Sequence, residues 1–150
     1  MQTAAENLTS PILIDADLFI SYLTGDKLEP HFHKVVEHSL NGRLTLLASS
    51  EIYDDVISAL RSQQTPLKTI HEFLEDMMII PHKTLPMTVE IAASALDLYQ
   101  KHGGRSKLHY FDSFHVATSE HERTPLLTSD RYILNHAREM SIKAIDPRTL

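Results

Sequence analysis

The sequence predicts an α/β protein in which a mostly parallel sheet of four to five strands is covered by helices on both faces. Short apolar runs alternate along the chain with longer segments whose apolar residues recur at helical spacing. The first run, Ile12–Ile14, contains only long or branched aliphatic residues, which is typical of a parallel strand buried on both faces. Asp15 follows this strand directly, and ligands bind at the carboxyl ends of strands in such sheets. Asp15 is therefore a candidate functional residue.

The amino-terminal half is expected to contain two strands and four helices. Residues 1–10 are interpreted as a flexible lead-in to a domain over residues 11–150. Asp17 suits the N-cap of a short apolar helix, because a carboxylate there accepts hydrogen bonds from free backbone N–H groups. Helical spacing of apolar residues predicts the other helices, with Asn41-Gly42 as a stop and Pro66 as a start. The expected elements after the first strand are helix 18–23, helix 29–40, strand 44–47, a helix that begins at Ser49 or Ser50, and a helix that begins at Pro66.

The carboxyl-terminal half is expected to contain three more strands. The clearest amphipathic helix runs from Thr88 to Lys101, with its apolar face predicted at residues 89, 92, 93, 96 and 99. A basic Gly-Gly loop at residues 102–107 separates it from the next helix. The expected elements are strand 77–80, helix 88–101, helix 110–120, strand 125–128, helix 130–140 and strand 142–145.

Composition restricts the class of protein. The chain has 150 residues, of which 42% are apolar and 23% charged, as in ordinary globular domains. No apolar run approaches the roughly 18 residues of a membrane span, and the amino terminus lacks a secretory signal pattern. The absence of cysteine excludes disulfides and thiolate metal sites, so a cytoplasmic protein is expected. A net charge of −6 argues against binding nucleic acid through bulk positive charge, but acids that hold divalent cations are compatible with it.

Four aspartates are expected to converge at one edge of the sheet. Asp15 and Asp130 follow predicted strands, and Asp55 and Asp112 lie near the starts of helices. Such a cluster repels itself unless hard divalent cations occupy it, and ligands that are all oxygens suit Mg²⁺ or Mn²⁺. Two such ions could stabilise the attacking and leaving oxygens of a phosphodiester displacement. The second acid stays ambiguous at this point, because Glu51 and Asp54 are alternatives to Asp55.

Four short motifs resemble those of the PIN-domain nucleases, a family that includes the VapC-type toxins. They occur in the family's order between residues 12 and 145. In chain order they are Ile14-Asp15-Ala16-Asp17-Leu18-Phe19, then Ser49 with Asp55 six positions on, then Tyr110-Phe111-Asp112-Ser113-Phe114-His115-Val116-Ala117-Thr118, and finally Leu126-Leu127-Thr128-Ser129-Asp130-Arg131-Tyr132. The chain departs from the family pattern at Asp17, where a neutral residue is usual, and at Asp55, where Glu is more frequent.

The resemblance implies a three-layer α/β/α fold and a Mg²⁺- or Mn²⁺-dependent endoribonuclease that cleaves single-stranded RNA. It implies that Asp15, Asp55, Asp112 and Asp130 are the catalytic, metal-binding acids. Asp17 and Thr128 would orient those acids. It further suggests a homodimer and, if the chain is a toxin, a small antitoxin that blocks the active site.

Basic and aromatic residues beside the predicted acids offer a route for the substrate. Positive groups that border a metal-filled acidic centre could hold flanking phosphates, and Tyr110 or Phe111 could stack on an unpaired base, although Phe111 fits the core better. The candidate phosphate-binding residues are Arg105, Lys107, His109 and Arg131.

Two other functions are compatible with parts of the sequence. The start Ile14-Asp15-Ala16-Asp17 superficially resembles that of haloacid-dehalogenase-type phosphatases, in which the first Asp is a nucleophile and the second a general acid. The Gly-Thr that normally follows and the late Gly-Asp pair are absent. A PIN-like scaffold that binds a protein or RNA without catalysis is the second alternative, and it predicts the loss of a metal-binding acid.

Overall fold

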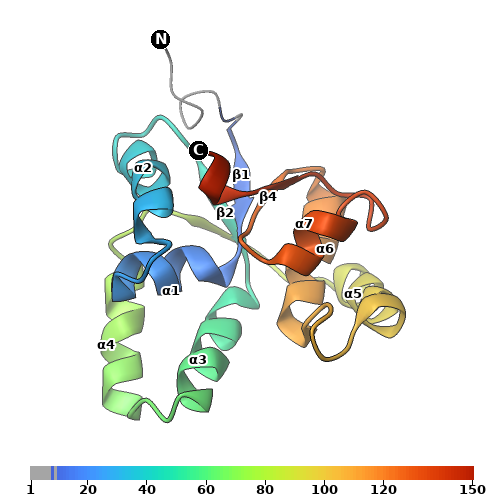
Figure 1. Ribbon diagram of the computed structural model, residues 1–150, viewed down its shortest axis with the longest axis horizontal. Helices are drawn as coiled ribbons and strands as arrows, with labels where there is room; N and C mark the ends of the chain where they lie inside the picture. The colour runs from blue at the N-terminus through green and yellow to red at the C-terminus, as the bar shows by residue number, and fades with distance from the viewer. Residues whose placement is uncertain (1–7, 9) are drawn as a thin grey trace.

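The computed structural model describes residue 8 and residues 10–150, and most of the predicted lead-in, residues 1–10, lies outside this part. Strands and helices alternate as expected (Figure 1). The strands are β1 (Ile12–Ile14), β2 (Leu46–Ser49), β3 (Lys83–Leu85), β4 (Leu126–Leu127) and β5 (Ala144–Ile145). The helices are α1 (Ala16–Thr24), α2 (Glu29–Leu40), α3 (Ile52–Ser62), α4 (Leu67–Met77), α5 (Val89–His102), α6 (Tyr110–Glu122) and α7 (Arg131–His136), followed by a 3₁₀ turn, η1 (Pro147–Thr149).

The five strands form a sheet in the order β3-β2-β1-β4-β5, and all four pairings are parallel. The chain moves from β1 outward to β2 on one side and later returns to add β4 on the other side of β1. Ligand sites in open parallel sheets lie at such a change of direction, beside the carboxyl ends of the strands. Asp15 stands directly after β1 and is therefore placed at this point of the sheet.

Helices cover both faces of the sheet, which confirms the predicted three-layer α/β/α fold. Figure 1 shows α1 to α4 on one side of the central strands and α5 to α7 on the other. The side chains of β1 alternate between these layers: Ile12 and Ile14 belong to the core under α1 to α4, whereas Leu13 belongs to the core on the other face. Every residue of β1 is fully buried, as the aliphatic run predicted.

One strand lies away from its predicted position. The apolar run Met77–Ile80 was expected to be the third strand, but it forms the end of α4 and the following turn. Met77 and Ile80 are buried while Met78 and Ile79 are exposed, and that spacing of three is helical. The third strand is instead Lys83–Leu85. It lies at the edge of the sheet, where a strand buries less side-chain surface and therefore needs fewer apolar residues.

Helix α5 has the predicted length, but a different face is buried. Ile91 and Ala95 pack against α6, while Val89 and Leu96, both predicted to lie in the core, are largely exposed. The small side chain of Ala95 lets the two helices approach closely. The face of α5 that is buried is therefore set by the size of its side chains rather than by the number of apolar residues on it. The last predicted helix, residues 130–140, ends at His136, and turns follow. In residue 8 and residues 10–150, no helix is both long and apolar enough to span a membrane.

Candidate active site

Asp15 is held at both carboxylate oxygens. Its Oδ1 accepts a hydrogen bond from the backbone N–H of Ala16 at 2.7 Å, which makes Asp15 the N-cap of α1. Its Oδ2 accepts a hydrogen bond from the hydroxyl of Thr128, on the neighbouring strand end, at 2.7 Å. Both residues are buried. The prediction that Asp17 caps this helix is therefore wrong, because the capping side chain belongs to the residue before the helix starts.

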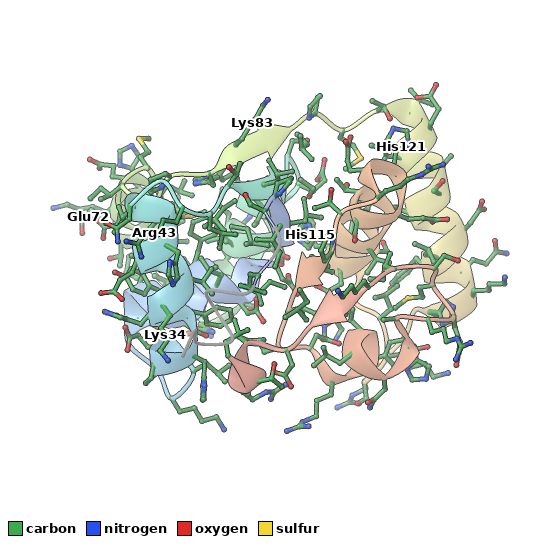
Figure 2. The ribbon with its side chains drawn as sticks, turned by 90° about the horizontal axis from the view of Figure 1, so that it is seen from above. Lys34, Arg43, Glu72, Lys83, His115 and His121 are labelled. Atoms are coloured by element: carbon green, nitrogen blue, oxygen red, sulfur yellow. The ribbon has the colours of Figure 1, made fainter. Side chains whose placement is uncertain are left out.

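Asp55 is oriented by a histidine from another helix. His115 of α6 is completely buried and lies near the centre of the molecule (Figure 2). Its Nε2 lies 2.8 Å from Oδ2 of Asp55, and its Nδ1 lies 2.8 Å from the hydroxyl of Ser49, at the end of β2. An ionised carboxylate can only accept, so Nε2–H donates to Asp55, and in the neutral ring Nδ1 accepts from Ser49. This chain of bonds fixes Asp55 relative to β2 and α6.

Asp112 lies in the first turn of α6 and faces both Asp15 and Asp55. One ligand atom from each of these three acids and from His115 fits within 4.8 Å of all the others. Asp130 lies on the other side of Asp112, and a second group, made of His109, Asp112 and Asp130, meets the same 4.8 Å limit. The fold thus brings all four predicted acids together, with Asp112 shared between the two groups.

The acids line one cavity of about 240 Å³ at the carboxyl edge of the sheet. Asp130 is the N-cap of α7, because its Oδ1 accepts the backbone N–H of Ile133 at 2.9 Å. Its own N–H donates to the Thr128 hydroxyl at 3.1 Å, so Thr128 contacts both Asp15 and Asp130. The cavity is lined by Asp15, Ala16, Asp17, Ile20, Ser21, Asp55, His109, Asp112, Ser129 and Asp130.

Asp17 also lines the cavity, but it binds the backbone beyond β4. Its Oδ2 accepts hydrogen bonds from the N–H of Ser129, at 2.6 Å, and from the Ser129 hydroxyl. Ser129 lies between Thr128 and Asp130, and its carbonyl accepts a further bond from Arg148 at 2.8 Å. Asp17 is therefore linked to two of the site residues through the loop that carries them. Its Oδ1 is buried and has no partner within the described residues.

Negative charge predominates in the cavity. Burial raises the pKa of Asp15 well above its ordinary value, and the nearby charges of Asp112 and Asp17 raise it further. Burial likewise raises the pKa of Asp17 to about 6 and the pKa of Asp130 above its usual range. The hydrogen bond to Asp112 raises the pKa of His109. A cavity lined by several carboxylates offers oxygen ligands and excess negative charge, which fits a hard divalent cation.

Of the four residues predicted to bind the phosphates of the substrate, only His109 lines the acidic cavity. His109 lies at the cavity, with its Nδ1 3.4 Å from Oδ2 of Asp112. Arg105 and Lys107 are exposed on the loop before α6, and Arg131 is exposed at the start of α7, and none of the three lines the cavity. Arg131 lies close enough to Asp146 to lower the pKa of that carboxyl together with Arg148, against the opposing effect of burial.

Among the three alternatives for the second acid, only Asp55 belongs to the cluster. Asp54 is exposed and lines a neighbouring cavity, and Glu51 stands before the first residue of α3. Sequence reasoning missed the structural part played by His115 and Ser49, although both stand inside the quoted motifs. The available signal was a histidine three residues after Asp112, a spacing that places two side chains near each other on a helix.

A buried cluster of carboxylates at the switch point of a parallel sheet defines an α/β protein with a candidate metal centre. The family model of the PIN domain matches residues 12–139, which is most of the chain, and the chain belongs to the PIN-domain family. This membership confirms the resemblance of the four motifs, and it argues against the phosphatase interpretation. Among curated protein sequences, none is detectably similar to this one.

Several solved structures share the fold. FitAcB from Neisseria gonorrhoeae superposes with a TM-score of 0.66 at 16% identity, covering 93% of this chain and 99% of that chain. VapBC2 from Rickettsia felis, bound to a DNA fragment from its promoter, gives a TM-score of 0.65 at 13% identity, with 91% and 98% covered. A toxin–antitoxin complex from Klebsiella pneumoniae gives 0.57 at 15% identity, with 93% and 99% covered. At these identities the likeness shows the fold alone.

Proposed function

We propose that this chain is a divalent-metal-dependent endoribonuclease that hydrolyses phosphodiester bonds of single-stranded RNA. The observation that carries the proposal is the meeting of Asp15, Asp55 and Asp112 within one buried cluster, although they are distant in sequence. Membership of the PIN-domain family, whose members are nucleases, supports the same chemistry.

Asp15, Asp55 and Asp112 are the residues that would hold Mg²⁺ or Mn²⁺, with Asp130 acting directly or through water. A bound divalent ion would supply positive charge for a phosphate oxygen and would favour ionisation of water as the nucleophile. Thr128 and His115 keep two of the carboxylates in fixed orientations through donated hydrogen bonds. His109, at the mouth of the cavity, is a candidate donor to the substrate phosphate, since the bond to Asp112 favours its charged form.

We further propose that the protein acts as the toxin of a toxin–antitoxin pair. The structures that share its fold include FitAcB and a toxin–antitoxin complex, and they are covered almost completely by this chain. A small antitoxin that blocks the acidic cavity is the expected partner, and a homodimer is the expected assembly. Expression of the chain alone in a bacterial host should arrest growth, while Asp112→Asn should relieve the arrest.

Metal binding and RNA cleavage together test the proposed activity. Titration calorimetry of the purified protein with Mn²⁺ should show binding, and Asp112→Asn should weaken it strongly. The same preparation should cut a single-stranded oligoribonucleotide in Mg²⁺ or Mn²⁺ and lose this activity in EDTA.

The alternative of a scaffold without catalysis gives the opposite results. In that case wild type and Asp112→Asn would both fail to bind Mn²⁺, and RNA would remain intact at every metal concentration. RNA binding that persists without cleavage would then assign a binding role to the fold.

A further inference from the structure

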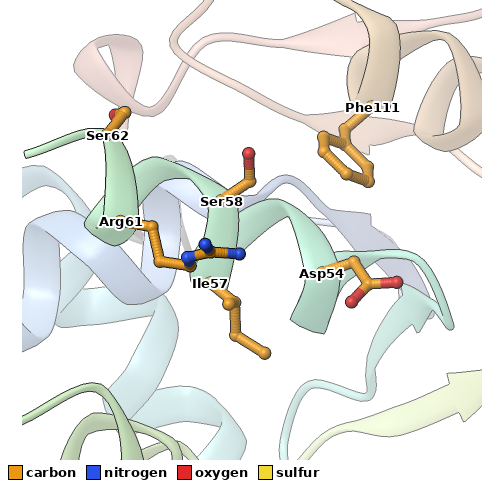
Figure 3. A pocket seen from close by; sticks show the side chains of 6 residues that line it. All are labelled: Asp54, Ile57, Ser58, Arg61, Ser62 and Phe111. Atoms are coloured by element: carbon orange, nitrogen blue, oxygen red, sulfur yellow. The ribbon is translucent and has the colours of Figure 1, made fainter. Parts of the chain in front are cut away.

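A second cavity, of about 420 Å³, lies between α3 and α6. Five of its six lining residues belong to α3 and the sixth, Phe111, belongs to α6 (Figure 3). Asp54 and Phe111 directly precede the cluster acids Asp55 and Asp112 in the sequence, and consecutive Cα atoms are only about 3.8 Å apart. The second cavity is therefore lined by the sequence neighbours of two of the cluster acids. Its lining residues are Asp54, Ile57, Ser58, Arg61, Ser62 and Phe111.

Phe111 forms the wall of this cavity that faces α3. Its ring is partly exposed, and it belongs to none of the buried apolar clusters found among the described residues. The ring of Tyr110 contacts it edge-on, with centroids 5.4 Å apart, so its position is supported from the side. The expectation that Phe111 fits the core is therefore wrong. An aromatic face held at a cavity wall is suited to stack on a nucleobase.

The opposite wall carries polar groups that the fold does not use. Arg61 is exposed and, within residue 8 and residues 10–150, takes part in no ion pair. Ser58 and Asp54 are also exposed, and neither side chain forms a hydrogen bond with any other described residue. A free guanidinium suits a phosphate, and a hydroxyl and a carboxylate suit the sugar or the polar edge of a base. Arg61, Ser58, Asp54 and Phe111 thus offer one group each for the phosphate, the sugar, the polar edge of the base and the face of the base.

We propose that this cavity binds the nucleotide next to the scissile phosphate of single-stranded RNA. Phe111 stacks on the base, Arg61 contacts the flanking phosphate, and Asp54 with Ser58 contacts hydroxyl or amino groups. The proposal rests on the proposed nuclease function and adds a location for the substrate. The volume of the cavity falls in the range of small-ligand sites, about 300–1,000 Å³, which accommodates one nucleotide.

A second copy of this chain is a poorer occupant of the cavity. If the cavity lay on the axis of a two-fold dimer, a concave surface would face a concave surface and leave a void. Asp54 and Arg61 would also lose their hydrating water without gaining a group of opposite charge from the second copy. A splayed nucleotide fills a concavity and offers both a π-face and a phosphate.

A single tryptophan can report occupancy of the cavity, because the chain contains none. Phe111→Trp keeps an aromatic face at the wall and adds the only indole of the protein. A short single-stranded oligoribonucleotide is titrated in EDTA and again with Ca²⁺, and we expect saturable quenching of the indole emission. An oligodeoxyribonucleotide of the same sequence measures the contribution of the 2′-hydroxyl.

Matched variants separate stacking and charge from folding. Phe111→Leu should weaken RNA binding by about 5- to 160-fold, because a stacked base is worth about 1–3 kcal/mol. Arg61→Gln should reduce the slope of log affinity against log salt by about 0.7, the value for one phosphate contact with a single strand. Arg43→Gln removes the same charge before β2, away from the carboxyl edge and from His115 (Figure 2), and should leave the slope unchanged.

Each failure has a distinct meaning. If wild type binds and cuts RNA while Phe111→Leu and Arg61→Gln behave like Arg43→Gln, the cavity is not the subsite and the nuclease proposal stands. If wild type neither binds nor cuts RNA, the proposed function fails as well. If the variants change the molecular mass in sedimentation instead of RNA affinity, a second copy occupies the cavity and the proposal is overturned. Circular dichroism of each variant excludes misfolding as the cause.

Discussion

The two neighbouring cavities differ in how their side chains are held. In the acidic cavity Asp15, Asp55 and Asp130 each accept a hydrogen bond from a partner in the protein, at 2.7 to 2.9 Å. In the neighbouring cavity the polar side chains of Arg61 and Ser58 are exposed and make no such bond within the described residues. Fixed groups suit chemistry, which requires preorganised charge, whereas polar groups without partners in the protein are available to contact an RNA strand. The comparison predicts that changes in the first cavity affect rate and metal affinity, and changes in the second affect RNA affinity.

Asp112→Asn is expected to have the largest effect. The amide is similar in size to the carboxylate but carries no charge, so the group shared by both clusters no longer attracts a cation. RNA cleavage should fall by more than about 100-fold, since even removal of a residue that only orients a metal ligand costs about 10- to 100-fold. Cleavage of a labelled oligoribonucleotide under single-turnover conditions measures this change.

The matched variant from the second cavity is Asp54→Asn, which neutralises a carboxylate next to Asp55 but outside the cluster. It should retain most of the maximal cleavage rate. An equal loss of rate in both variants would contradict the separation of the two cavities.

Thr128→Val is expected to have an intermediate effect on metal binding. The substitution removes the hydroxyl that donates to Asp15 and accepts from the N–H of Asp130, and it preserves the shape of the side chain. Affinity for Mn²⁺, measured by calorimetry, should fall about 10- to 100-fold. Thr118→Val is the control, because the hydroxyl of this buried threonine bonds the Phe114 carbonyl within α6, and it should leave Mn²⁺ affinity unchanged.

The metal-free protein should lose stability as pH rises through the pKa of Asp17. This pKa is about 6 in the folded protein against 3.8 ordinarily, mainly because burial disfavours the charged form. Between these values the folded protein holds the proton that the unfolded chain has released, so the stabilising contribution is complete below about pH 4 and is lost above about pH 6. The pKa of Asp15 shifts in the same direction. For Asp17 alone the loss is at most about 3 kcal/mol.

Asp17→Asn tests this pH dependence without removing the acceptor for Ser129. Its free energy of unfolding, measured with urea in EDTA, should decline less between about pH 4 and about pH 7 than that of wild type. A parallel decline in both proteins would show that Asp17 ionises normally. The same variant should keep much of its metal-dependent nuclease activity, whereas a phosphatase that used Asp17 as general acid would lose its activity.

The smallest effects are expected from Arg105→Gln and Lys107→Gln. Both side chains are exposed on the loop before α6 and lie outside both cavities. Each should reduce the salt dependence of RNA binding by at most about 0.7 in the slope, and neither should change the single-turnover rate. A loss of rate comparable to that of Asp112→Asn would place this loop in the chemistry and contradict the ranking.

The sequence predicted what depends on local order along the chain. Strand β1 is entirely aliphatic and buried, so the position of Asp15 at the carboxyl edge followed from the strand itself. The convergence of Asp55, Asp112 and Asp130 with it followed from the rule that parallel strands end at one edge. Their residue-level roles, including the orienting roles assigned to Asp17 and Thr128, stay predictions until variants are measured.

Features that depend on packing between distant segments could not be predicted. Edge strand β3 has little apolar content, whereas the run Met77–Ile80 before it has the apolar composition expected of a buried strand. Only the spacing of the buried residues in the structure shows that this run is helical. The buried face of α5 was decided by the close approach that Ala95 permits. The bond between His115 and Asp55 joins residues 60 apart in sequence, and no local periodicity reports such a contact.

The double role of Asp15 has a practical consequence for anyone who needs an inactive form of this protein. Its carboxylate starts α1 through Ala16 as well as facing the acidic cavity. Replacing Asp15 by alanine would remove a helix cap, which is worth about 1 kcal/mol. The less stable protein would be less abundant in the cell, and this loss would be mistaken for lost catalytic activity. Asp112 caps no helix, so a substitution there gives the cleaner inactive protein for trapping substrates or partners.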